Sequence, residues 1–144
     1  MTLLEQVRAW LETYPGMERL TAFRVDELGA ADSGGLFPQG LTELERREDI
    51  LGNVEVLNEY RFLLSCAFGK ARENGAEANA EWLLAFQDWV QACSAQGMVA
   101  QLGGEGTEQG TARAEKGALS KDSEDGTAAY TVALTIKFKR RYEV

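Results

Sequence analysis

The chain has 144 residues, an apolar fraction of 44% and a formal net charge of −8. A chain of this size is one domain of ordinary length with a self-sufficient core, and the composition is that of a folded protein. The acidic charge argues against a general nucleic-acid-binding protein. No run of eighteen apolar residues is present, so we expect no membrane span.

The sequence contains no histidine, which removes histidine-based catalysis and histidine-based zinc sites. Carboxylate and lysine chemistry stay open. The N-terminal stretch has no basic segment leading into an apolar run, so we expect no secretory signal. Cys66 and Cys93 both fall on apolar faces, which favours buried free thiols in a reducing compartment; a disulfide requires bridging distance.

The first elements follow from capping and periodicity. Thr2, with Glu5 three residues later, has the form of a capping box, and the apolar spacing that follows predicts a helix over 2–14. Pro15 and Gly16 stop that helix. We predict a short strand over 20–25.

The next segment is read from its composition. Residues 29–40 are predicted to be a loop because they are rich in glycine and polar residues. Residues 41–49 are charged on both faces and are predicted to be an edge strand or an arm. A turn at 49–53 then leads into the following strand.

Two long segments alternate apolar and polar residues with period two, which predicts long half-buried strands over 54–68 and 127–142. Fifteen residues of strand span roughly 50 Å, but a compact domain of this size is only about 35–40 Å across. These strands are therefore expected to bend, to carry bulges or to project beyond the domain.

A second helix is predicted over 76–96, with an apolar stripe that includes Trp82, Phe86 and Trp89, and with Gly97 at its end. The glycine-rich stretch at about 97–125 is predicted to be flexible, with a strand near 111–120. The polar cluster at 121–126 predicts a hairpin turn. The whole chain, 1–144, is thus one α+β domain: an antiparallel or mixed four-stranded sheet with two amphipathic helices on one face.

Three features are candidates for chemistry, and each has a simpler explanation. The segment GGEGTEQG at 103–110 lacks the spacing of a phosphate loop, and KDSEDG at 121–126 lacks the carboxylates of a calcium loop. The carboxylates near 26–27 and 43–49 are interspersed with arginines, which favours salt bridges over catalysis. We therefore predict no catalytic, cofactor or metal site, and a protein that is not an enzyme.

One basic cluster stands out against the acidic total: Lys137, Lys139, Arg140 and Arg141. It predicts either contact with DNA or an acidic partner, or lysines that protect a strand edge. Because the surrounding chain is acidic, edge protection is favoured over nucleic acid. As candidate interface residues we take Lys137, Lys139 and Arg141 on the basic side and Glu43, Glu45 and Glu48 on the acidic side.

Four stretches in order resemble a known family. They are FRVDELGAADSGGLFPQG at 23–40, DILGNVEVLNEYRFLL at 49–64, NAEWLLAFQDWV at 79–90 and GTAAYTVALTIKFKRRYE at 126–143. Together they resemble the small tail completion proteins of long-tailed phages and prophages, often labelled minor capsid proteins. These are similar in organisation to tail terminators. No stretch is a catalytic signature.

The resemblance implies a virion structural protein that forms a hexameric ring, terminates or completes the tail tube, and joins it to the head. Its partners are expected to be further copies of itself, the tail tube protein and head–tail connector proteins, without a membrane or specific nucleic acid. The resemblance places it in the virion after assembly in the bacterial cytoplasm. The alternatives are another head–tail joining or minor capsid component, and a small carboxylate-dependent enzyme acting on nucleic acid.

Overall fold

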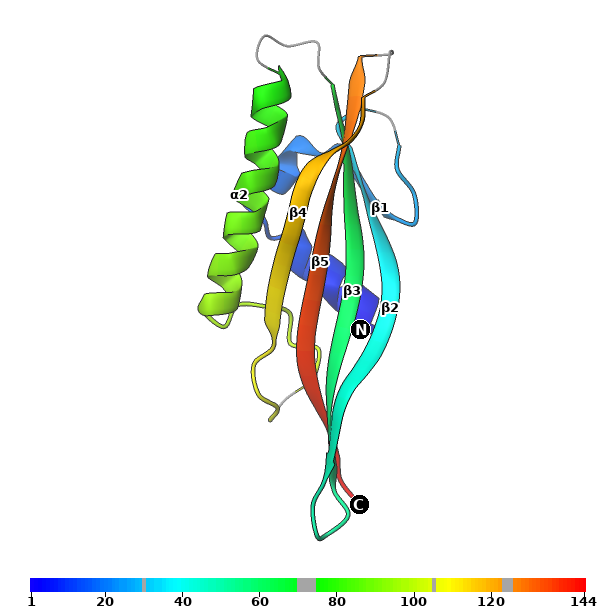
Figure 1. Ribbon diagram of the computed structural model, residues 1–144, viewed down its shortest axis with the longest axis vertical. Helices are drawn as coiled ribbons and strands as arrows, with labels where there is room; N and C mark the ends of the chain where they lie inside the picture. Colours follow the sequence, from blue (N-terminus) through cyan, green and yellow to red (C-terminus); the bar gives the residue numbers. More distant parts are fainter. Residues whose placement is uncertain (30, 70–74, 105, 123–125) are drawn as a thin grey trace.

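The computed structural model describes residues 1–29, 31–69, 75–104, 106–122 and 126–144. Two α-helices, one 3-10 helix and five strands follow one another along these residues (Figure 1). In order they are α1 (Leu3–Leu11), η1 (Pro15–Arg19), β1 (Ala22–Val25), β2 (Ser33–Glu48), β3 (Val54–Gly69), α2 (Gly75–Ala95), β4 (Thr111–Asp122) and β5 (Thr127–Tyr142).

The strands form one mixed sheet in the order β1-β2-β3-β5-β4. All neighbours are antiparallel except β1 and β2, which run parallel. The prediction of an α+β fold is confirmed, but the prediction of four strands is wrong, because β2 adds a fifth between β1 and β3. The loop predicted at 29–40 is wrong for residues 33–40, which form one continuous strand with 41–48, where the strand alternative of the prediction is confirmed.

Packing explains why the glycine-rich part of β2 is a strand. Leu36 is fully buried in the core. A side chain at Gly34 would collide with those of Leu20 and Phe23, and one at Gly35 would collide with the backbone carbonyl of Glu27. The glycines therefore allow close approach by neighbouring segments, and the tertiary contacts override the loop-like composition.

The helices largely follow their predicted boundaries. The backbone N–H of Glu5 donates to Thr2 Oγ1 at 3.1 Å, as the predicted cap requires. The first helix is shorter than predicted, since it ends at Leu11 before η1 begins at Pro15. At the end of α2, Gly97 has φ +69°, and the N–H of Met98 donates to Cys93 O at 2.8 Å. That hydrogen bond is the pattern of a Schellman cap, so the predicted role of Gly97 is confirmed.

The core lies between the helices and one face of the sheet, here called the inner face. Alternate residues of β3 and β5 enter it, among them Phe62, Leu64, Val132 and Leu134, all essentially inaccessible to solvent. Each fully buried side chain of this size contributes roughly 1.5–3 kcal/mol relative to an exposed one. The period-two prediction for these two strands is confirmed.

The two predicted long strands project beyond the domain, and the irregularities in pairing lie on their neighbour β2. β3 and β5 pair without interruption over all sixteen residues of each, whereas β2 carries irregularities between Pro38 and Leu41 and between Glu43 and Glu45. Figure 1 shows the β2–β3 hairpin and the end of β5 extending beyond the helices. The predicted turn at 49–53 forms the tip of this hairpin. Part of the predicted turn at 121–126 lies outside the described residues.

The strand predicted near 111–120 is confirmed as β4. Cys66 and Cys93 are buried and free, as predicted. Burial raises the pKa of the Cys66 thiol to about 12. Within the described part of the chain, no helix has the length and apolar character needed to cross a membrane.

Candidate assembly surface

The sheet has a second face, here called the outer face, that no helix covers. Figure 1 shows the helical elements behind or beside the sheet. The outer face is made by the residues of β3 and β5 that alternate with the core residues, together with their partners on β2 and β4. Among the described residues, the segment that contains Glu27 lies against this face at Gly35, and Glu59, Ser65 and Ala67 on the same face are also buried.

The outer face is basic although the protein is acidic. Its register positions hold seven basic and four acidic residues, a net charge of +3 on a chain with a net charge of −8. The basic residues are Arg47, Arg61, Arg113, Lys121, Lys137, Lys139 and Arg141, and the acidic residues are Glu45, Glu55, Glu59 and Glu115.

The middle of the outer face mixes apolar and charged side chains, with Phe37 of β2 paired with Leu63 of β3. Leu63 pairs with Ala133, and the next row places Arg61 beside Thr135 and Arg113. The arginines are already engaged within the chain: Arg61 contacts Glu59 at 3.0 Å, and Arg113 contacts Glu115. Lys137, in the following row, forms no ion pair with any described residue.

The exposed face of α2 has the opposite character. Glu77, Glu81, Leu84, Asp88 and Gln91 are exposed and follow one another at intervals of four and three, so they form one stripe along the helix. The helix contains no lysine or arginine. Its three carboxylates form no ion pair with a described residue. Leu84, 60% exposed, is the large apolar side chain in this acidic stripe.

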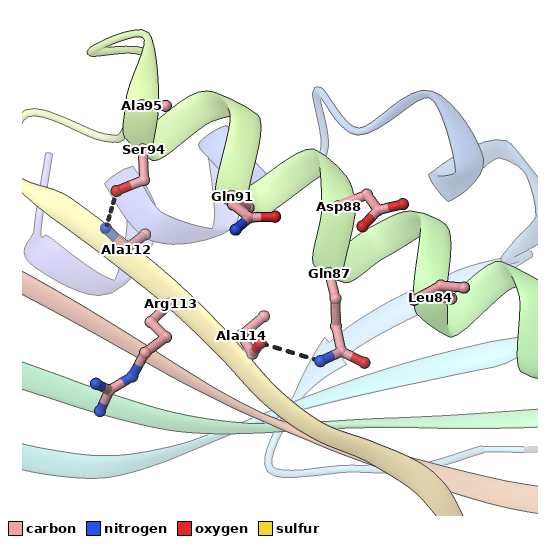
Figure 2. Close-up of a pocket in the computed structure, with 9 residues that line it drawn as sticks. All are labelled: Leu84, Gln87, Asp88, Gln91, Ser94, Ala95, Ala112, Arg113 and Ala114. Carbon is pink, nitrogen blue, oxygen red and sulfur yellow. Dashed lines mark hydrogen bonds between the residues drawn. The ribbon is translucent and has the colours of Figure 1, made fainter.

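A groove of about 460 Å³ separates α2 from β4 (Figure 2). At its floor, Gln87 Nε2 donates to the carbonyl of Ala114 at 3.1 Å, and the N–H of Ala112 donates to Ser94 Oγ at 3.1 Å. These bonds occupy backbone groups at the edge of the sheet, which protects that edge against the addition of another strand. Figure 2 also shows Arg113 pointing away from α2, toward the outer face.

Of the predicted basic interface residues, Lys139 and Arg141 lie toward the projecting end of β5, whereas Lys137 still pairs with Thr111 of β4. Lys139 Nζ contacts Glu108 at 2.8 Å and Glu55 at 3.7 Å. The hydrogen bond and charge of Glu108 raise the pKa of Lys139, and the same bond lowers the pKa of Glu108. Arg141 contacts Glu143 at 3.5 Å. Lys139 and Arg141 are therefore partly neutralised within the chain, unlike Lys137.

The predicted acidic residues lie on β2, two strands from β5, at the same end of the molecule. Glu45 shares a row with Leu57 and Lys139 on the outer face, whereas Glu43 and Glu48 follow the parity of the inner face. Glu43 contacts Arg46 at 2.8 Å, and Glu45 contacts Arg47 at 2.7 Å. The structure thus brings Glu45 near Lys139 in one chain and does not place the two groups on opposite sides.

Carboxylates elsewhere do not gather into a metal-binding arrangement. Within the described residues, no group of three or more cysteine, aspartate or glutamate side chains is placed to hold a metal ion. Asp26 and Glu27, which the sequence grouped with Glu43 and its neighbours, follow β1 instead. Glu27 forms a surface ion pair with Arg24 at 3.0 Å.

The tip of the β2–β3 hairpin exposes two large apolar side chains, Ile50 and Leu51. Asp49 orders this tip, because its Oδ1 accepts hydrogen bonds from the N–H groups of Leu51 and Asn53 at 2.9 and 3.0 Å. Asn53 Oδ1 in turn accepts from the N–H of Val144 at 3.1 Å. These hydrogen bonds tie the backbone of the apolar tip to the turn and to the C-terminal residue.

Sequence reasoning missed the acidic stripe of α2 and the outer-face arginines Arg61 and Arg113. The signal for the stripe was present: Leu84 lies between Glu81 and Asp88 at helical spacing, off the apolar stripe that was taken as the core side. The arginines had no comparable signal, because only strand pairing brings them beside Lys137.

Comparison with protein-family models and with curated proteins finds no match to this chain.

Proposed function

We propose that this chain is a virion structural protein that terminates or completes the tail tube of a long-tailed phage and forms the surface that joins it to the head. The observation that carries the proposal is the outer face of the five-stranded sheet, which no helix among the described residues covers and which is open to a partner away from the corner at Gly35. An antiparallel sheet commonly packs one face on the core and leaves the other in solvent, so the outer face is available for association with a partner.

Four sequence stretches resemble tail completion proteins, and this resemblance is the reason for proposing a long-tailed phage as the particle. The projecting hairpin supports an assembly role, since an ordered tip with exposed Ile50 and Leu51 offers an apolar contact beyond the body of the domain. In this proposal the partners are further copies in a ring, the tail tube protein and head–tail connector proteins. The protein assembles in the bacterial cytoplasm and resides in the virion.

The proposal is tested by deleting the coding sequence from the genome that carries it and examining the particles by electron microscopy. We expect tails of irregular length that lack heads, and normal particles when the gene is supplied in trans. Tails of normal length without heads indicate a head–tail joining role instead. Unchanged, infectious particles, or the absence of any particle in the parent strain, overturn the proposal.

A further inference from the structure

We propose that the acidic face of α2 in one copy docks on the outer face of the sheet in the next copy. This inference rests on the proposed ring-forming function and names the two surfaces that meet in it. The occupant of the outer face is thus a second copy of this chain, contributing the stripe from Glu77 to Gln91.

Charge complementarity supports this pairing. The helix carries three carboxylates and no basic residue, and the register positions of the outer face sum to +3, or to +1 when Glu108 and Glu143, which contact Lys139 and Arg141, are counted. The three carboxylates and Lys137 form no ion pair with described residues of their own chain, so they can pair with another copy. Opposite charges across an interface fix its register and accelerate encounter.

Both surfaces also have apolar side chains at their centres. The exposed side of α2 holds six alanines and one large apolar side chain, Leu84. A smooth helix of this kind can approach a sheet closely. The centre of the outer face, at Phe37, Leu63 and Ala133, is apolar and only partly exposed. In the proposed contact Leu84 covers this centre, with the flanking carboxylates directed at the basic rim.

Other pairings of the same surfaces are less favourable. A two-fold contact through either face would place like charges together, acid on acid at α2 or base on base at the outer face. An edge-to-edge contact would bring α2 against β2, where residues 41–49 hold four acidic and two basic residues. Charge therefore selects the head-to-tail arrangement, which produces a ring if the rotation closes.

Two variants with opposite charge changes test the pairing. In the helix variant, Glu81→Lys with Asp88→Lys makes α2 basic while the outer face stays basic. In the sheet variant, Arg113→Glu with Lys137→Glu makes the outer face acidic while α2 stays acidic. Each variant alone should need about tenfold more protein than the parent to assemble, because like charges now face each other.

The decisive measurement is an equimolar mixture of the two variants, followed by light scattering after size-exclusion chromatography. When the two variants alternate in a head-to-tail assembly, the basic α2 of the helix variant meets the acidic outer face of the sheet variant. The acidic α2 of the sheet variant likewise meets the basic outer face of the helix variant. The mixture should therefore assemble as the parent does. Circular dichroism and melting of each variant provide the folding control. If both variants assemble normally, or the folded variants fail to assemble both alone and together while the parent forms rings, the inference is wrong.

Cysteine trapping tests the same contact where assembly is transient. A chain with Leu84→Cys and Ala133→Cys should give covalent dimers and higher ladders on mild oxidation, whereas Met98→Cys with Ala133→Cys should not. The native thiols are buried and do not interfere. If rings or complete tails form but the Leu84→Cys, Ala133→Cys chain gives no covalent dimers or higher oligomers, the inference is wrong and the proposed function is unaffected. If the gene proves dispensable for tail completion, the proposed function falls, and this inference falls with it.

Discussion

Asn53 donates two hydrogen bonds to the carboxylate of Asp49, from its backbone N–H and its side-chain amide, each at 3.0 Å. A third bond, from the N–H of Asp49 to the carbonyl of Asn53 at 3.0 Å, closes the same turn. Five residues at the end of a projecting hairpin are thereby ordered without a core around them. The turn chemistry is local, as expected for an aspartate that bonds backbone groups two and four residues later.

The pKa of Asp49 should report whether the hydrogen bonds of this turn are formed. Partial desolvation raises the pKa of Asp49, but the hydrogen bonds from Asn53 and Leu51 together lower it below its ordinary value of 3.8. Because the pKa is lowered in the folded state, its contribution to stability is present above the ordinary value and is lost as pH falls through the folded value. Titration by nuclear magnetic resonance should show this depressed pKa, which Asn53→Ala should raise toward 3.8. An unchanged pKa in that variant would show that Asn53 does not hold the carboxylate.

Substitution in the aromatic cluster beneath α2 should destabilise the fold strongly. Phe86 is fully buried, with its ring centroid 5.3 Å from Tyr14 and 6.0 Å from Trp82. Phe86→Ala should lower the free energy of unfolding by about 3–5 kcal/mol, because it leaves a cavity. The matched control is Leu84→Ala on the exposed side of the same helix, with an expected change within about 0.5 kcal/mol. Urea denaturation measures both, and equal effects would contradict the assignment of the two faces.

Cys66 should be chemically inert and should make the protein sensitive to alkali. Burial raises its pKa from 9.0 to about 12, so the neutral thiol is favoured in the folded state. Stability from this group is therefore complete below pH 9.0 and is lost as pH rises toward about 12. Neither thiol should react with an aromatic disulfide reagent at pH 8 in the folded protein, and both should react in denaturant.

The matched comparison is Cys66→Ala, which should lose less stability between pH 9.0 and about 12 than the parent does. Rapid modification of Cys66 in the native protein, or identical alkaline curves for parent and variant, would count against a buried thiol at this position.

Gly103 fixes the segment after α2 against β5. A side chain at this position would collide with the carbonyl oxygen of Lys139 and with Thr107. Gly103→Ala should therefore lower the free energy of unfolding by about 1–3 kcal/mol, as overpacking does. Gly69, at the end of β3, has open space around it, and Gly69→Ala should be neutral or stabilising by about 0.4–1 kcal/mol. Thermal melting separates the two, and a neutral Gly103→Ala would show that this segment is not held at β5.

Local sequence patterns correctly predicted the features that depend only on residues within one element. The capping of α1 by Thr2, the end of α2 at Gly97 and the alternation of β5 depend on neighbours within a few residues, and the structure agrees with each. The flexibility predicted for 97–125 was read from glycine content and stays a prediction. Leu102 is buried and Gln109 Nε2 donates to Val99 O at 3.1 Å, so parts of that stretch have defined contacts.

The sequence by itself determined the α+β class, both helices and the long strands, because their periodicity is carried by consecutive residues. Only the tertiary structure decided that residues 33–48 form a strand, since Leu36 and Gly34 gain their partners from β1 and the core rather than from adjacent residues. It also decided the candidate assembly surface. Arg61, Arg113 and Lys137 lie on three different strands, and only hydrogen-bond register places them on one uncovered face, opposite in charge to the stripe on α2.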